Sequence, residues 1–243
     1  MTAAAPRFEL LGEDARADLA ERLESKFVFV RHDTAILRDA LRALCRPIVY
    51  ADPVSRVQSV YFDDLRFSAC RANLAGVGVR HKTRLRWYDR DLPGDRFQLE
   101  IKWRRHQSTG KHRFAFRGGE RLRTARLAAV PGEVAELLPA RFAAVLDRAL
   151  QPVTLVEYRR EHFALGRARL TLDYDLRVYP LLGMSRFARR FGERLPGITV
   201  IECKTPLAGE PELRPLLRSL RTRPSRFSKY VTACQRLGYA TAG

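Results

Sequence analysis

Apolar and polar residues alternate with a period of two along many segments of the chain, which predicts β-strands with one apolar face. The strands expected on this basis are Glu24–Val30, Gln58–Phe62, Val77–Tyr88, Phe97–Trp103, Thr154–Leu165, Arg167–Leu176 and Ile198–Lys204. Short turns, such as the ones at Pro93-Gly94-Asp95 and at Gly166, separate neighbouring strands. Consecutive strands joined by short turns predict an antiparallel meander.

Apolar residues with helical spacing predict helices between and after these strands. Asp33 or Thr34 can cap a first helix, which carries an apolar stripe and ends before Pro47. The other segments expected to be helical are 122–150, interrupted near Pro131-Gly132 and Pro139, then 211–220 and 226–237. We expect residues 179–197 to form a loop with Arg-rich helical character, and the residues before Glu24 to be loosely structured.

The same tripeptide pattern, Glu-x-Lys, occurs in three of the expected strands. Its occurrences are Glu24-Ser25-Lys26, Glu100-Ile101-Lys102 and Glu202-Cys203-Lys204. Because side chains two residues apart share one face of a strand, each tripeptide places an acid and an amine side by side. Half of the lysines in the chain lie in this pattern, which is hard to attribute to chance. The lysines are Lys26, Lys82, Lys102, Lys111, Lys204 and Lys229.

The formal net charge of the chain is +18, from 45 basic and 27 acidic residues. A charge of this size favours anionic partners. Most of the basic residues are arginine, however, so a general preference for arginine accounts for part of the excess. The position of the charges on the expected strands is therefore more informative than their number.

One expected strand carries four cations in succession on a single face, at Arg80, Lys82, Arg84 and Arg86. One interpretation is the solvated side of an ordinary antiparallel sheet. If several charged faces instead converge around one space, like charges repel by on the order of a few kcal/mol per close pair unless an anion binds. We therefore predict an α+β fold in which a closed antiparallel β-barrel forms a charged tunnel and the helices pack outside it.

Such a tunnel has the chemistry needed to bind phosphates. Arginine offers planar forks to phosphate oxygens, lysine offers point charges, and glutamate can hold a divalent metal that bridges the phosphates. Phosphoryl transfer depends largely on positioning and charge stabilisation, so no Ser–His or Cys–His nucleophile is required.

The cysteines, histidines and tryptophans suggest no further catalytic or metal-binding chemistry. The cysteines show no C-x-x-C pairing, which predicts reduced thiols in the cytoplasm, and no apolar run approaches the length of a membrane span. We expect the histidines to be surface or packing residues and the two tryptophans to be core anchors. These residues are Cys45, Cys70, Cys203, Cys234, His32, His81, His106, His112, His162, Trp87 and Trp103.

Seven short segments, in order along the chain, resemble a known family. They are Ser59-Val60-Tyr61-Phe62-Asp63, Arg84-Leu85-Arg86-Trp87-Tyr88, Glu100-Ile101-Lys102, Tyr158-Arg159-Arg160, Arg169-Leu170-Thr171-Leu172-Asp173, Glu202-Cys203-Lys204 and Phe227-Ser228-Lys229-Tyr230. Their succession is similar to the polyphosphate polymerase domain of the vacuolar transporter chaperone (VTC) complex, a member of the triphosphate tunnel metalloenzymes, or CYTH superfamily. The resemblance covers residues 24–238, with 1–23 as a flanking segment and 239–243 as a tail. It implies a tunnel of about eight antiparallel strands.

The resemblance also implies roles for individual residues. The phosphate-binding tunnel residues, expected to be catalytic, are Lys26, Arg84, Arg86, Lys102, Arg160 and Arg169, to which the strand faces add Lys204. Further phosphate-binding residues are Lys82, Lys111 at a basic loop position, Tyr158, Ser228 and Lys229. Glu202 corresponds to the metal-binding glutamate and Glu100 is the expected second acid, for Mn²⁺ or Mg²⁺. Because Arg159 and Arg160 are adjacent, only one can line the tunnel, and the motif favours Arg160.

Three functions remain open from the sequence. The first is a metal-dependent polyphosphate polymerase that uses a nucleoside triphosphate, and the second is a triphosphate hydrolase of the same architecture. The third is a non-catalytic module that binds polyphosphate or nucleic acid. No zinc-finger spacing, RNP-like strand or helix-turn-helix is present, so we expect no specific nucleic-acid partner, and the sequence identifies no protein partner.

Overall fold

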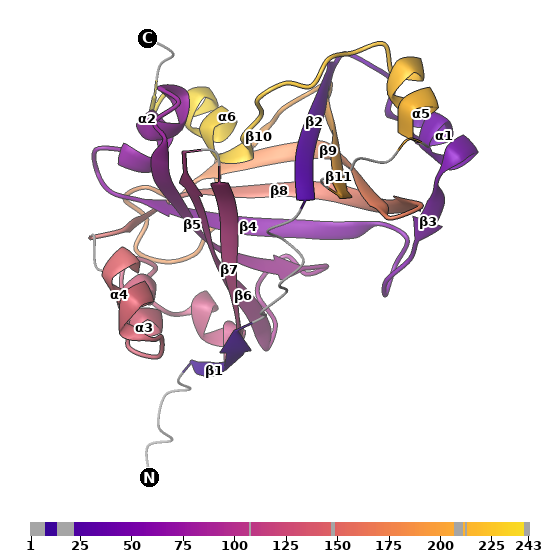
Figure 1. Cartoon of the computed structure of the whole chain (residues 1–243). Coiled ribbons are helices and arrows are strands. Elements are labelled where there is room, and N and C mark those ends of the chain that lie inside the picture. Colours follow the sequence, from indigo (N-terminus) through magenta and orange to yellow (C-terminus); the bar gives the residue numbers. More distant parts are fainter. Residues whose placement is uncertain are drawn as a thin grey trace.

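One large antiparallel sheet organises the computed structural model, which describes residues 8–13, 22–106, 108–146, 149–206, 211 and 213–240. The sheet has eleven strands: nine follow the order β1-β7-β6-β5-β4-β8-β9-β11-β2, while β10 pairs with β9 and β3 with β8 (Figure 1). The strands are β1 Glu9–Glu13, β2 Arg22–Val30, β3 Arg46–Ile48, β4 Ser55–Asp63, β5 Val79–Tyr88, β6 Arg96–Arg105, β7 Ser108–Arg117, β8 Gln151–Leu165, β9 Ala168–Pro180, β10 Glu193–Arg194 and β11 Ile198–Pro206. The α+β class with an antiparallel sheet is confirmed.

Helices lie in three groups around the sheet (Figure 1). The helices are α1 Thr34–Leu44, α2 Ser68–Leu74, α3 Val130–Ala135, α4 Ala140–Leu146, α5 Leu213–Ser219 and α6 Lys229–Arg236, with a 3₁₀ turn at Gly119–Arg123. The pairs in contact are α1 with α5, α3 with α4, and α2 with α6. The first pair lies near β2 and β11, the second near β6 and β7, and the third near β4 and β5. Among the helices described, none is long and apolar enough to cross a membrane.

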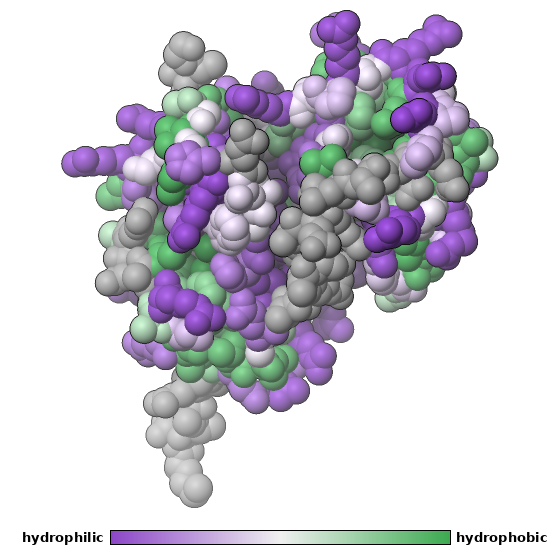
Figure 2. Space-filling view, viewed as in Figure 1, coloured by the Kyte–Doolittle hydropathy of each residue, from purple (hydrophilic) through white to green (hydrophobic). Residues whose placement is uncertain are grey.

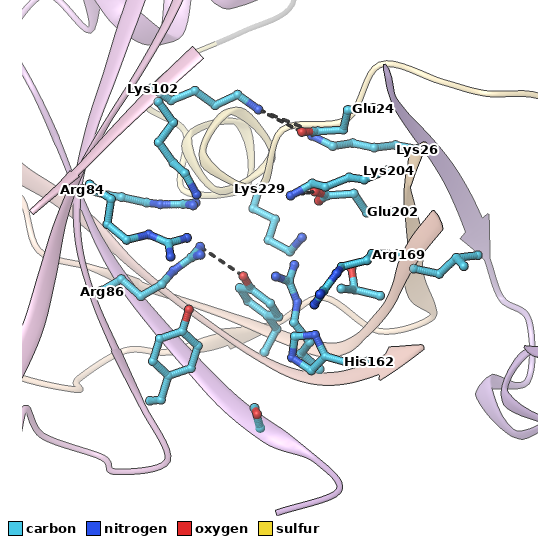
Figure 3. Close-up of a pocket in the computed structure, with 18 of the residues that line it drawn as sticks. Glu24, Lys26, Arg84, Arg86, Lys102, His162, Arg169, Glu202, Lys204 and Lys229 are labelled. Atoms are coloured by element: carbon cyan, nitrogen blue, oxygen red, sulfur yellow. Dashed lines mark hydrogen bonds and ion pairs between the residues drawn. The ribbon is translucent and has the colours of Figure 1, made fainter. Parts of the chain in front are cut away.

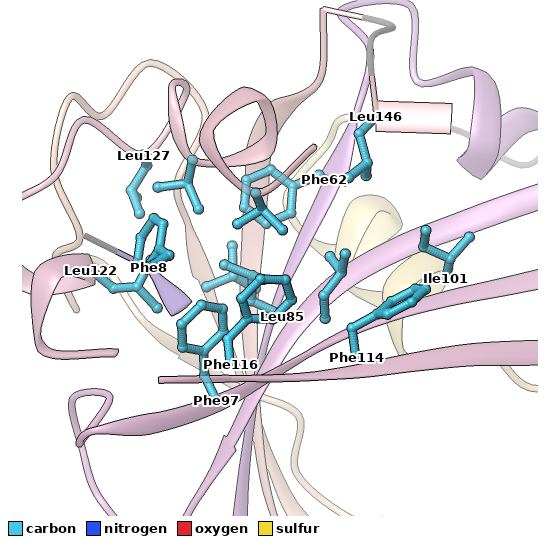
Figure 4. Close-up of a cluster of buried hydrophobic side chains, with 14 of the residues drawn as sticks. Phe8, Phe62, Leu85, Phe97, Ile101, Phe114, Phe116, Leu122, Leu127 and Leu146 are labelled. Atoms are coloured by element: carbon cyan, nitrogen blue, oxygen red, sulfur yellow. The ribbon is translucent and has the colours of Figure 1, made fainter. Parts of the chain in front are cut away.

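The apolar faces of the strands bury three clusters of side chains. The largest packs β4–β7 against the 3₁₀ turn, α3 and α4, with Phe97, Phe114 and Phe116 at its centre (Figure 4). A second joins β2, β9 and β11 to α1 and α5. The third packs α6 against Tyr61 and Tyr158, which point to the other face of β4 and β8. The alternation in the sequence therefore supplies the first two clusters and leaves the opposite strand faces for charged residues and for the contacts with α6.

Strand β2, at one end of the strand order, contacts β6 and the segment before α6 without pairing, among the described residues, with another strand on that side. In the described part of the chain, no backbone ladder connects β2 to β7, so the predicted closure of the barrel is not established by hydrogen bonds. The segment before α6 lies along the free edge of β2, since Ser225 N donates to Lys26 O at 2.8 Å. Lys26 Nζ donates to Phe227 O at 3.2 Å, and Lys102 Nζ lies 3.4 Å from Glu24 Oε1. The Lys102–Glu24 contact thus bridges β6 and β2, and the segment before α6 covers the free edge of β2.

Several elements differ from the prediction. Strands β1, β3, β7 and β10 and helix α2 were not predicted, and residues 181–192 contain no helix, so the expected helical character of that loop is wrong. In β7, Gly110 faces Trp103 of β6, where an added Cβ would lie 2.2 Å from the indole ring. The glycine makes room for the ring but interrupts the strand pattern. Residues 9–13 form a strand on β7, although the N-terminal segment was expected to be loose.

Candidate functional site

A cavity of about 540 Å³ lies on the charged faces of the strands. In the space-filling view, hydrophilic side chains border a hollow between the part that carries α2 and α6 and the part that carries α1 and α5 (Figure 2). Thirteen of the fourteen residues predicted for the site line the cavity; Glu100 alone is missing. The thirteen are Lys26, Lys82, Arg84, Arg86, Lys102, Lys111, Tyr158, Arg160, Arg169, Glu202, Lys204, Ser228 and Lys229. The structure thus brings them together, while their catalytic roles remain predictions.

One wall of the cavity, formed by β5, β6 and β7, carries mostly cations. The strand register places Lys82 opposite Lys102, and Lys102 opposite Lys111. Like charges directly opposite each other destabilise a sheet. We call this side of the cavity the cationic wall. An anion in the cavity would relieve the repulsion among its lysines.

Glu100 neutralises part of the positive charge of the cationic wall. Its side chain is 1% exposed and forms ion pairs with four cations, which are Arg84, Arg86, Lys111 and Arg113. Burial raises the pKa of Glu100, but these cations outweigh burial and hold the pKa well below its ordinary value. Both carboxylate oxygens already accept hydrogen bonds, from Arg84 Nε at 2.6 Å and from Lys111 Nζ at 3.3 Å. The geometry therefore favours Glu100 as the acid that positions arginines rather than as the second metal ligand that was expected.

The opposite wall, formed by β2, β11 and β9, mixes acids with bases. Lys204 lies opposite Glu24, and Glu202 lies opposite Lys26, so two Glu-x-Lys tripeptides interlock across neighbouring strands. Figure 3 shows these four side chains facing Arg84, Arg86 and Lys102 across the cavity. We call this side the mixed wall. Because its charges alternate, it can hold a metal as well as phosphates.

Glu202 remains ionised although it lies at the cavity. Burial raises its pKa, but Lys204, Lys26 and Arg160 outweigh burial, so the pKa of Glu202 is well below its ordinary value. For Glu24, burial and the charge of Glu202 raise the pKa, and Lys102 with the neighbouring lysines brings it below the ordinary value. Both carboxylates can therefore offer anionic oxygens at neutral pH.

Arg160 points into the cavity and Arg159 points away from it, as predicted. Arg160 donates to both oxygens of the buried Asp173, from Nε at 2.6 Å and from Nη2 at 2.7 Å. Lys229, at the start of α6, donates to the same carboxylate at 2.6 Å. Arg159 is 57% exposed and pairs with Asp175 instead. Asp173 therefore holds a cation from β8 and a cation from α6 in one place.

Two tyrosines orient the arginines of the cationic wall. Arg84 Nη1 donates to the Tyr61 hydroxyl at 2.8 Å, and Arg86 Nη2 donates to the Tyr158 hydroxyl at 3.2 Å. Tyr158 was expected to bind phosphate, and in the structure its hydroxyl contacts a basic neighbour, Arg86. Each guanidinium keeps further N–H groups for a ligand, because it has five donors.

Two lysines of the cationic wall are poised to change charge near neutral pH. Burial, together with Lys102 and Lys26, lowers the pKa of Lys82 to about 7. Burial lowers the pKa of Lys111 to about 8, although Glu100 acts in the opposite direction. Lys82 Nζ donates to Ser228 Oγ at 3.0 Å, so its nearest partner is neutral. A bound phosphate would favour the charged form of both lysines.

The carboxylates of the mixed wall fit a divalent metal of the hard type. No group of three or more His, Cys, Asp or Glu side chains gathers at metal spacing within the described ranges. Mg²⁺ is commonly held by one or two carboxylates together with substrate phosphates, so a larger cluster is not needed. Glu202 and Glu24, both on the cavity lining, meet this requirement.

Residues that line or support the site but were not predicted for it include Glu24, Tyr61, Arg113, His162 and Asp173. Glu24 and Asp173 stand on charged strand faces, which was the available signal. Arg113 could not be found because β7 was not predicted, and Lys111 lies in that strand rather than in a loop. His162 was expected only at the surface or in packing. It lines the cavity, where burial and Arg160 lower its pKa to about 4.

Comparison with known proteins agrees with this arrangement. The family model of the VTC domain matches residues 21–238. The chain belongs to the VTC-domain family. A search of curated proteins found no match.

Solved structures show the same fold as this VTC-domain chain. A putative adenylyl cyclase from Hippeastrum, described as having a dominant triphosphatase activity, aligns with a TM-score of 0.50 and 19% identity over 91% of this chain and 97% of that one. A putative adenylate cyclase from Bacillus halodurans aligns with a TM-score of 0.50 and 11% identity over 90% of this chain and 98% of that one. The shared fold is that of the triphosphate tunnel, or CYTH-like, proteins.

Proposed function

We propose that this protein is a metal-dependent polyphosphate polymerase, which transfers the terminal phosphoryl group of a nucleoside triphosphate to a polyphosphate chain. The observation that carries the proposal is the cavity itself, in which the cationic wall faces a mixed wall that carries ionised glutamates. Membership of the VTC-domain family supports it. The curved sheet would act as the tunnel through which the polymer is held.

The proposed reaction needs positioning and charge stabilisation from the protein. A terminal oxygen of polyphosphate forms a bond to the γ-phosphorus, while the bond from that phosphorus to the β,γ-bridging oxygen breaks and the nucleoside diphosphate leaves. Arg84 and Arg86 are held by Glu100, Tyr61 and Tyr158, so their free N–H groups are fixed before phosphates bind. Fixed donors stabilise developing charge without the cost of reorganisation.

A divalent metal supplies further neutralisation of the phosphate charge when it is bound. Glu202 would hold it, with Glu24 as the second carboxylate. Lys26 and Lys204 lie next to these acids and keep the glutamates ionised. The same lysines can contact phosphates that the metal leaves uncovered.

The decisive experiment incubates the purified protein with ATP and Mn²⁺ and separates the products by chromatography. Long-chain polyphosphate and ADP are expected. Arg84→Ala and Lys204→Ala should each lower the rate by at least about 100-fold, the usual loss when a preorganised donor is removed. Arg159→Ala serves as the matched control, because Arg159 lies next to Arg160 in the chain but points away from the cavity.

Hydrolysis is the second candidate, because the structurally similar Hippeastrum protein is described as a triphosphatase. Orthophosphate from tripolyphosphate, without polymer from ATP under any metal or primer, would replace the polymerase by a hydrolase. Binding of polyphosphate without any turnover would support the third function, a non-catalytic binding module. The three outcomes are read from the same chromatogram.

A further inference from the structure

A second group of cations lies where the cationic wall continues beyond the cavity. Arg80 shares the face of β5 that carries Lys82, Arg84 and Arg86, and the register places it directly opposite Arg104 of β6. Neither Arg80 nor Arg104 belongs to the lining of the cavity, which ends at Lys82 and Lys102 on these strands. The row of cations is therefore longer than the cavity that the proposed reaction requires.

Arg226 brings a third positive charge to the same place. It lies in the segment before α6, with its Nη1 3.6 Å from the position that a Cβ on Gly76 would take. Burial and the charges of Arg104 and Arg226 together lower the pKa of Arg80, so both guanidinium groups lie within electrostatic range of Arg80. Ser228, two residues after Arg226, contacts Lys82 of the cavity. The three arginines thus adjoin the cavity at its Lys82 end.

In the described part of the chain, the hydrogen bonds of Arg80 and Arg104 go to neutral groups. Arg80 donates to the carbonyl oxygen of Val77, and Arg104 Nε donates to that of His106 at 2.7 Å. The Asn73 amide, oriented to satisfy its hydrogen bonds, accepts from Arg80 Nε at 3.2 Å and from Lys82 Nζ at 3.1 Å.

Within the ranges that the structure describes, no carboxylate forms an ion pair with Arg80, Arg104 or Arg226, whereas Glu100 pairs with four cations deeper in the wall. Opposed like charges without an acid are unfavourable in a sheet. They suit an anion from outside the chain.

We propose that Arg80, Arg104 and Arg226 form an outer subsite, which binds the phosphates of a polyphosphate chain where the chain leaves the cavity past Lys82. The inference rests on the proposed function, because it assigns a route to the polymer of that reaction. Successive cations on β5 stand about 7 Å apart, from Arg86 through Lys82 to Arg80. A long polyanion can follow this row continuously, whereas a triphosphate is satisfied by the cavity alone.

Equilibrium binding of two ligands tests the outer subsite without any need for turnover. The variant Arg80→Gln/Arg104→Gln is compared with a control, Arg90→Gln/Arg126→Gln, which removes the same charge from exposed arginines that lie outside the cavity lining and have no carboxylate partner in the described part of the chain. Tripolyphosphate and long-chain polyphosphate are titrated into each protein in EDTA. Melting temperatures establish that both variants fold.

The expected result is a loss of about tenfold or more in affinity for long-chain polyphosphate, since each arginine contributes a charged hydrogen bond, with little change for tripolyphosphate. The control should bind both ligands as the unchanged protein does. Equal losses for the two ligands, or losses as large in the control, would overturn the outer subsite. Single-stranded RNA is titrated afterwards as a control ligand, and an equal loss for RNA would also overturn the outer subsite, because it would indicate a general site for anionic polymers.

Failure of the proposed function would be distinct from failure of this inference. A protein that makes no polymer but shows the length-dependent loss would keep the outer subsite as a polyphosphate-binding surface. A polymerase whose product length and affinity for long chains are unchanged in Arg80→Gln/Arg104→Gln would keep its activity and lose the outer subsite.

Discussion

Lys82 lies among like charges in the cationic wall. Lys102 lies opposite it on β6, its contacts are with Ser228 and Asn73, and no carboxylate in the described residues pairs with it. Its pKa of about 7 follows from burial among like charges. A residue in this state gains a proton when an anion arrives, so ligand binding and proton uptake are coupled.

Affinity for tripolyphosphate should therefore fall as the pH rises from 6 to 9. Below pH 6 Lys82 is already charged, so binding takes up no proton there. Above its pKa of about 7 the lysine is neutral in the free protein, and binding must also protonate it. Titration calorimetry in two buffers of different ionisation enthalpy measures the proton uptake directly.

Lys82→Arg provides the test of the assignment, because arginine stays charged throughout this range. The variant should bind tripolyphosphate with a weaker dependence on pH and take up fewer protons near pH 7. Lys111, whose pKa is about 8, accounts for the dependence that remains. A pH profile identical to that of the unchanged protein would exclude Lys82 as the titrating group.

At the scale of elements, α6 connects the site to the core. Its N-cap Ser228 and its first residue Lys229 reach the cavity, while Tyr230 stacks on Tyr61 and donates to Asp63 Oδ2 at 2.7 Å. Asp63 also accepts from the backbone N–H groups at the start of α2. One buried carboxylate thus fixes both helices at this end of the cavity.

Tyr230→Phe should lower the free energy of unfolding by about 1.5–3 kcal/mol, the range for a hydrogen bond to a charged group. Urea denaturation measures this loss. Activity should fall as well, because Lys229 and Ser228 depend on the position of the helix. Tyr239→Phe is the matched control: the ring of Tyr239, which follows α6 in the chain, stacks on Phe67, and removal of its hydroxyl should cost less than about 0.5 kcal/mol. Equal losses of stability in the two variants would contradict a stabilising role for the hydrogen bond between Tyr230 and Asp63.

The charged faces could be predicted from the sequence because they depend on local alternation. Arg84 and Arg86 point into the cavity for the same reason that Leu85 and Trp87 point into the core. Contacts between distant strands could not be predicted in this way. The pairing of Lys102 with Glu24 joins residues that are far apart in the chain. The ion pairs of Glu100 depend partly on Arg113 in β7. This strand was not predicted because Gly110 interrupts its pattern. Part of the positive charge around Glu100 was therefore missed, and the glutamate was expected to bind a metal.

At the scale of the whole molecule, the two walls divide the work of holding phosphate. The cationic wall can bind phosphates directly, whereas the mixed wall offers carboxylates that repel phosphate unless a metal intervenes. Net charge alone does not describe this division, because arginines such as Arg159 are paired or exposed elsewhere. Because the two walls hold phosphate in different ways, we expect turnover of ATP to depend on the metal more strongly than binding of phosphates does.

EDTA should therefore abolish turnover of ATP but leave the binding of tripolyphosphate to the cationic wall. Binding to the folded state alone raises the free energy of unfolding by about 2.7 kcal/mol when free ligand is at a hundredfold excess over Kd, and thermal denaturation with and without EDTA measures this gain. Glu202→Gln should reproduce the effect of EDTA, since it removes a metal ligand and leaves the cationic wall intact. If EDTA also removed the stabilisation, the metal would be needed for phosphate binding itself, and the cationic wall could not act alone.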